Sequence, residues 1–136
     1  MNEQEIEISR ALVYLESVVE DHSAYLEELE NLLVFPAQDI DFKRVEVILK
    51  RMRKIRRDLA SSINIIISNI DKVNDKKLRE EALGILSYFY LIGFNDEKDL
   101  LLSIKDTSSK IGYELDIVKD LSEIDELRSK MEKFSL

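Results

Sequence analysis

The residues best suited to chemistry form a run of bases in the first half of the chain. Segment 43–57 carries eight Lys and Arg side chains against one Glu. Clustered bases release counterions from nucleic acids and attract other anionic surfaces. The sequence therefore offers a candidate anion- or nucleic-acid-binding face, made of the six most closely spaced bases: Lys50, Arg51, Arg53, Lys54, Arg56 and Arg57.

A second interpretation is that these bases are neutralised within the protein. Residues 1–41 carry eleven acids and one base, and a helical hairpin would place such acids beside the bases. The whole chain has a net charge of −8, whereas nucleic-acid-binding domains are usually basic overall. No aromatic side chain interrupts the run of bases from 50 to 57 to stack on nucleobases. Neutralisation by the N-terminal helix is therefore the favoured interpretation, and nucleic-acid binding is the alternative.

His22 is the only histidine in the chain, and it lies within an apolar heptad stripe. A lone histidine in a helical bundle invites comparison with histidine phosphotransfer domains. Those domains usually place a Lys three residues after the histidine and a Gly after that, but Tyr25 and Leu26 occupy these positions here. We therefore expect a packed imidazole with one hydrogen-bond partner.

Other catalytic and metal-binding patterns are missing from the sequence. There is no Cys, and the Glu-x-x-His pair of di-iron bundles fails because residue 19 is Val. The three glycines are far apart, so no phosphate-binding loop or nucleophile motif can be formed. We expect a protein without enzymatic activity, without a bound metal and without a cofactor.

The elements that position these residues are predicted to be long helices. Only three Gly and one Pro are present, so the chain has few turns and its elements are few and long. In the first third, core positions recur at spacings of four and three, which is typical of a helix that buries one seam. These positions are Ile8, Leu12, Leu15, Val19, His22, Leu26, Leu29 and Leu33.

We predict an all-α, antiparallel four-helix bundle that forms a single domain over residues 1–136. Two long N-terminal helices are expected at about 3–34 and from Asp39 or Asp41 to about 73, separated by Pro36. A short third helix is expected at about 76–92, with Asn74 or Asp75 as its cap and Gly93 as its terminator. A long C-terminal helix is expected at about 97–134.

The unequal lengths of the last two helices predict an assembly. A short third helix would leave the second half of the fourth helix overhanging the bundle. A homodimer, or docking into a larger protein assembly, would then bury its apolar side chains Leu121, Ile124, Leu127 and Met131. The alternative is a fourth helix that breaks near Ser108–Gly112, where weak helix formers gather, and folds back on its own chain.

The sequence also bounds the location and the class of function. The first residues are polar and acidic rather than a secretory signal, and the apolar runs are too short to span a membrane, so we expect a cytoplasmic protein. The expected function is that of a non-enzymatic helical protein–protein interaction or assembly subunit that self-associates. The alternative is a nucleic-acid-associated factor that uses segment 43–57.

Overall fold

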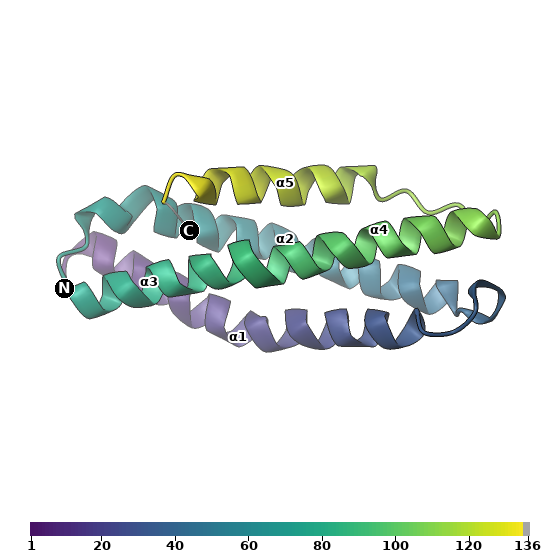
Figure 1. The fold of residues 1–136 in the computed structure, drawn as a ribbon. Coiled ribbons are helices and arrows are strands. Elements are labelled where there is room, and N and C mark those ends of the chain that lie inside the picture. The colour runs from purple at the N-terminus through teal and green to yellow at the C-terminus, as the bar shows by residue number, and fades with distance from the viewer. Residues whose placement is uncertain (135–136) are drawn as a thin grey trace.

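Four helical columns run side by side in the computed structural model, which describes residues 1–134 (Figure 1). Consecutive columns run in opposite directions, and the third column consists of two helices joined by a π-helical turn at Phe89–Gly93. The predicted all-α, antiparallel four-helix bundle is therefore confirmed. The α-helices are α1 (Glu3–Leu32), α2 (Phe42–Asn69), α3 (Lys76–Tyr88), α4 (Phe94–Lys110) and α5 (Val118–Glu132).

The starts of the first three helices are set by side chains that cap free backbone amides. Asn2 and Glu5 form a reciprocal capping box at the start of α1. The Asp41 carboxylate accepts the Arg44 N–H at the start of α2, and Asp75 caps α3 in the same way. Asp41 and Asp75 are among the caps predicted from the sequence.

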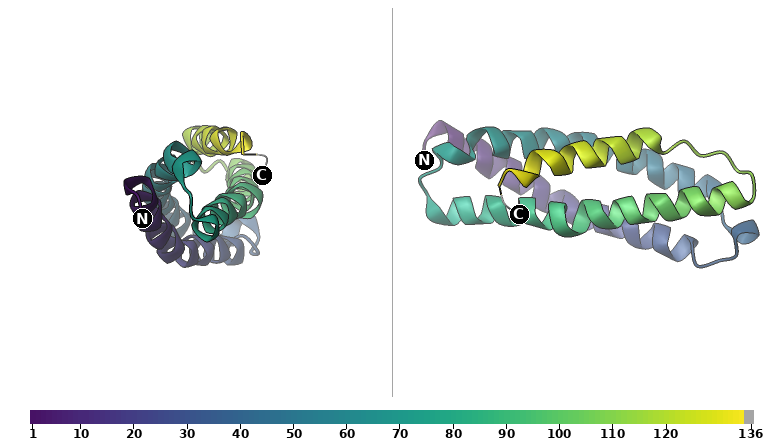
Figure 2. Two further views of the ribbon diagram at one scale, coloured as in Figure 1. Left: turned by 90° about the vertical axis from the view of Figure 1, so that its left-hand side faces the viewer. Right: turned by 45° about the horizontal axis from the view of Figure 1, so that its top comes forward.

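The helices surround one apolar core. α1 packs along α2 and also contacts α3 and α4, whereas α5 lies between α2 and α4, on the side away from α1 (Figure 2). Within residues 1–134, no helix combines the length and the apolarity needed to cross a membrane. The core contains fully buried side chains from every column, among them Ile8, Leu15, Ile48, Leu59, Ile63, Phe89, Phe94 and Ile124.

The predicted lengths of the third and fourth helices are wrong, because the chain does not stop at Gly93. This glycine keeps right-handed helical geometry, with φ −57° and ψ −56°. The backbone continues through the π-helical turn, where the Phe94 N–H donates to the Phe89 carbonyl oxygen. A Cβ atom at position 93 would lie 3.0 Å from the Phe89 ring. Gly93 therefore provides space for that ring and does not terminate the helix.

The chain reverses instead at the end of α4. Gly112 has a φ of +71°, and the N–H groups of Gly112 and Tyr113 donate to the carbonyl oxygens of Ser109 and Ser108. These two bonds form a Schellman motif, which ends a helix at a left-handed residue. The predicted alternative, a break near Ser108–Gly112 followed by a segment that folds back, is the observed structure.

This reversal removes the overhang from which self-association was predicted. The third column now runs from Lys76 to Lys110, so it matches α1 and α2, and α5 returns along the bundle. Ile124, Leu127 and Met131 are buried within their own chain, and Leu121 is half-buried. These four side chains therefore provide no exposed apolar surface of the kind that was expected.

Two glycine substitutions should have opposite effects on stability. Gly112→Ala is expected to lower the free energy of unfolding by about 1–2 kcal/mol, because a Cβ atom disfavours left-handed geometry. Gly84→Ala is expected to raise it by about 0.5–1 kcal/mol, because Gly84 lies inside α3 with open space where its Cβ would be. Urea unfolding of both variants tests the pair, and equal effects would contradict the assignment of Gly112 as the helix terminator.

Candidate functional site: a buried ion-pair network

The most prominent polar feature of the protein is a network of charged side chains centred on Arg56. Arg56 lies on the core-facing side of α2 and is 2% exposed. Its Nη1 donates to Asp120 at 2.8 Å and to Glu123 at 3.0 Å, both on α5. Its Nε and Nη2 donate to Glu97 on α4, at 3.3 and 3.2 Å. The guanidinium thus connects three helices through four of its five N–H groups.

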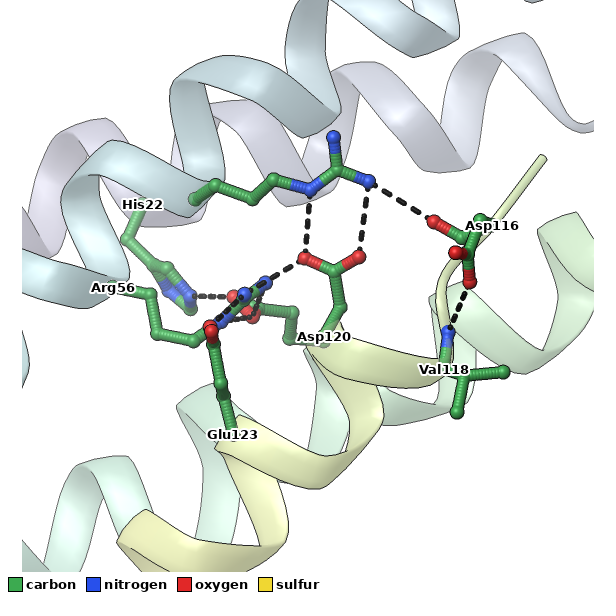
Figure 3. Close-up of polar contacts among 8 residues, drawn as sticks. His22, Arg56, Asp116, Val118, Asp120 and Glu123 are labelled. Atoms are coloured by element: carbon green, nitrogen blue, oxygen red, sulfur yellow. Dashed lines mark hydrogen bonds and ion pairs between the residues drawn. The ribbon is translucent and has the colours of Figure 1, made fainter.

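The Glu97 carboxylate extends the network to α1. Its second oxygen lies 3.0 Å from Nε2 of His22, and both side chains are buried (Figure 3). An ionised carboxylate only accepts hydrogen bonds, so Nε2 of His22 carries the proton. Among the described residues Nδ1 of His22 has no partner, and the rings of Phe89 and Phe94 face the imidazole edge-on. The predicted packed imidazole with one partner is confirmed.

Asp120 receives a second guanidinium, from Arg53. Arg53 Nε and Nη2 donate to the two Asp120 oxygens at 2.9 and 3.0 Å, which is the bidentate geometry that Arg favours with carboxylates. Arg53 Nη2 also donates to the Asp116 carbonyl oxygen at 3.2 Å. The Asp116 side chain accepts the Val118 N–H at the start of α5 (Figure 3). The arginines of α2 therefore hold the first turn of α5 and the linker that precedes it.

The pKa directions agree with an ionised network. Burial alone would raise the pKa of Asp120, but hydrogen bonds from Arg53 and Arg56 outweigh it and hold the pKa below its ordinary 3.8. Burial alone would lower the pKa of Arg56, but the Glu97 charge and the Asp120 and Glu123 hydrogen bonds raise it. Arg56 and Asp120 are therefore a charged pair in the folded protein.

This pairing predicts the pH dependence of stability. Because the pKa of Asp120 is lower in the folded protein than in the unfolded chain, its stabilising effect is present above pH 3.8 and is lost as the pH falls through the folded-state pKa. The difference in unfolding free energy between the wild type and Asp120→Asn should be constant between about pH 7 and about pH 5 and shrink below pH 3.8. Urea unfolding at a series of pH values measures it.

The control for this prediction is Asp125→Asn. Asp125 is an exposed carboxylate on α5 that pairs with Lys98 at 2.9 Å. An exposed pair contributes at most about 1 kcal/mol, so the control should differ little from the wild type at any pH. A difference for Asp120→Asn that persists unchanged below pH 3.8 would contradict the lowered pKa.

The structure divides the six predicted anion-binding residues among different surroundings. Arg56 is inside the network, and Arg53 is half-buried at its edge. Arg51 and Lys54 are exposed and line no part of the groove between α2 and α5. Lys50 and Arg57 line that groove, a cavity of about 490 Å³ open to solvent, together with Arg53, Asp116, Lys119, Asp120 and Glu123.

Neutralisation within the protein occurs, but mainly with other acids than those predicted. Between α1 and α2, the structure shows one pair that joins a base of the 43–57 segment to an acid of α1, Arg44 with Glu28 at 2.6 Å. The main partners are Glu97, Asp120 and Glu123, from α4 and α5. The prediction was wrong on this point because it placed the second half of the fourth helix beyond the bundle, whereas α5 folds back against α2.

No family model, curated protein or solved structure matches this chain. The chemical capability of the site therefore follows from its geometry. Within residues 1–134, no group of three or more His, Cys, Asp or Glu side chains is arranged to hold a metal ion. Both oxygens of Glu97 and of Asp120 accept hydrogen bonds from within the chain. The network joins four helices. The space open to solvent beside it is the groove between α2 and α5, which Arg53, Asp120 and Glu123 of the network help to line.

Proposed function

We propose that the protein is a non-enzymatic helical association module that works as a homodimer or as a subunit of a larger protein assembly. The observation that carries the proposal is the way in which α5 is attached. Besides Asp120 and Glu123, α5 contacts its neighbours through polar side chains along its length. Asp125 pairs with Lys98, Arg128 donates to the Tyr90 carbonyl oxygen, and Glu132 accepts from the Tyr90 hydroxyl.

An attachment of this kind favours association over catalysis. Each exposed ion pair contributes little to stability. The apolar stripe of α5 is narrow, because only three apolar side chains of this helix are buried: Ile124, Leu127 and Met131. The attachment of α5 therefore depends on its charged side chains, in particular on Asp120 and Glu123, as much as on its apolar stripe. A helix from another chain with the same pattern of carboxylates and apolar side chains would fit the surface that α5 covers.

The mass of the purified protein in solution tests this proposal. Light scattering should give a mass above that of the 15.9 kDa chain, and this mass should rise with concentration in the micromolar range. A high-salt sample should shift the distribution, because ion pairs at the α5 surface are screened. A single monomeric mass at every concentration, together with no co-purifying protein, would contradict the proposal.

A second candidate function is the binding of a polyanion such as nucleic acid in the α2–α5 groove. It is favoured by Lys50, Arg57 and Lys119, which line the groove and form no ion pair within residues 1–134. Neighbouring Asp120 is already neutralised by its two arginines. The groove therefore presents cations to solvent, although the chain as a whole is acidic.

Charge reversal tests this candidate without disturbing the network. Lys50→Glu, Arg57→Glu and Lys119→Glu combined should abolish salt-dependent binding of labelled RNA or DNA. The matched control reverses three exposed bases of α2 that do not line the groove: Lys43→Glu, Arg51→Glu and Lys54→Glu. Equal loss in both triple variants would indicate a general charge effect, and no binding by the wild type would reject the candidate.

A further inference from the structure

We propose that two copies of this chain associate by exchanging α5, so that each copy's network is completed by Asp120 and Glu123 of the other copy. The inference rests on the self-association proposed above and specifies how it occurs. Three features of the described chain support it: the linker before α5, the apolar side chains that this linker leaves exposed, and the chemistry of the surface that α5 covers.

The linker 111–117 is held in its reversed path by few polar interactions and by the burial of Ile117 at its end, which is 1% exposed. Gly112 supplies the left-handed turn, Tyr113 stacks on Phe42 with ring centroids 4.9 Å apart, and the Asp116 carbonyl oxygen accepts from Arg53. A cavity of about 510 Å³, open to solvent, lies along the linker. A short hinge loop between two helices is the kind of segment at which domain exchange occurs.

The linker also interrupts an apolar pattern that continues across it. Ile104, Ser108, Ile111, Leu115 and Val118 keep spacings of four and three, which is one stripe of a continuous helix. In the reversed path Ile111 is 42% exposed and Val118 is 63% exposed. If residues 111–117 became helical, α4 and α5 would form one helix over 94–132. Ile111, Leu115 and Val118 would then line one side of it, beyond the end of their own bundle.

A second copy is the occupant that fits this arrangement. Its extended helix carries the same stripe, and two such helices crossing at a twofold axis bury their stripes against each other. Each α5 then reaches the other bundle, where Arg56 and Glu97 lie buried and need partners. A covering helix must present carboxylates three residues apart, followed by apolar residues, and the second copy's Asp120, Glu123, Ile124, Leu127 and Met131 meet this requirement.

Cross-linking two positions that lie side by side on α4 and α5 distinguishes exchange of α5 from other modes of association. The chain has no cysteine, so Lys98→Cys with Asp125→Cys places the only two thiols at positions whose side chains pair at 2.9 Å. The protein is refolded at high concentration, and its monomer and dimer fractions are separated. Each fraction is treated with a short thiol-to-thiol reagent and analysed under denaturing conditions. The exchanged dimer should give covalent dimers, and the monomer fraction should give internally linked chains.

The matched control is Glu28→Cys with Arg44→Cys. This pair joins α1 to α2, two helices that do not exchange, so it should link internally in both fractions. If the dimer fraction of the Lys98/Asp125 variant gives internal links or no link, exchange is wrong while self-association stands. If the wild type forms no dimer at any concentration, exchange is wrong, and the proposed function also fails if no protein co-purifies with the chain.

The hinge provides an independent test of the same proposal. Gly112→Ala removes the residue that favours the turn and promotes helix across the linker, so the ratio of dimer to monomer should rise by at least about fivefold. Insertion of four Gly and Ser residues between Glu114 and Leu115 should lower the ratio, because a longer linker lets α5 fold back without strain. Unchanged ratios in both variants would overturn the proposal.

Discussion

Replacing Arg56 by methionine is expected to lower the free energy of unfolding by about 3–5 kcal/mol, as measured by urea unfolding at neutral pH. Methionine fills much of the space of the arginine stem but donates no hydrogen bond. Glu97 is 1% exposed, and after the substitution only the His22 ring would remain to form a hydrogen bond with it. An ionised carboxylate left without its partner in the core is the main source of the expected loss.

Two further variants make this prediction specific. Arg51→Met removes an exposed base from the same helix and should change stability by no more than about 0.5 kcal/mol. Arg56→Met combined with Glu97→Gln should recover part of the loss, because the unpaired negative charge is removed. A loss below about 1 kcal/mol for Arg56→Met would show that water or rearrangement replaces the arginine.

Replacing Phe89 by alanine is also expected to cost about 3–5 kcal/mol, through the cavity that it leaves in the core. The Phe89 side chain is fully buried, with its ring centroid 5.3 Å from that of Phe94 and 6.0 Å from that of His22. The cavity would lie beside the imidazole and admit water to Nδ1, which has no partner within the described chain. Urea unfolding gives the stability, and the histidine proton resonances report the change in surroundings.

The matched control for Phe89 is Phe35. This phenylalanine lies in the connection after α1 and is 56% exposed, so Phe35→Ala should change stability by no more than about 0.5 kcal/mol. Phe89→Leu should fall between the two, since it leaves a smaller cavity. If Phe89→Ala left the histidine resonances unchanged, the ring would not be what shields the imidazole.

The first half of the fold was predictable because each signal there is local. α1 follows from an unbroken heptad pattern, and α2 follows from a heptad pattern with one irregular step, from Leu59 to Ile63; Asp41 is one of the two caps predicted for α2. The second half was not predictable in the same way. The buried positions before residue 89 and after residue 93 are out of phase by about one residue, or ~100° around a helix. Such a shift resembles the end of one helix and the start of another, and Gly93 strengthened that interpretation.

Only the basic residues of the site were predictable from the sequence. Arg53 and Arg56 belong to the basic segment that the sequence singles out, but their partners come from the helices whose lengths were wrong. One signal could have found them. Asp120 falls in the apolar stripe of α5, between Ile117 and Ile124. A charge at a core-facing position indicates a buried partner of opposite sign, because an isolated charge is too costly to bury.

The π-helical turn makes the third column tolerant of one change in chain length. It accommodates one residue more than a regular α-helix would hold between α3 and α4. Loss of a single codon there, for instance that of the exposed Leu91, would allow a regular helix through the turn and would bring the buried positions on its two sides into phase. Glu97 would then still face His22 and Arg56, whereas the loss of a second residue would turn it away by ~100°. Length variation in related chains should therefore be found in the 111–117 linker and, as the loss of one residue, at 89–93.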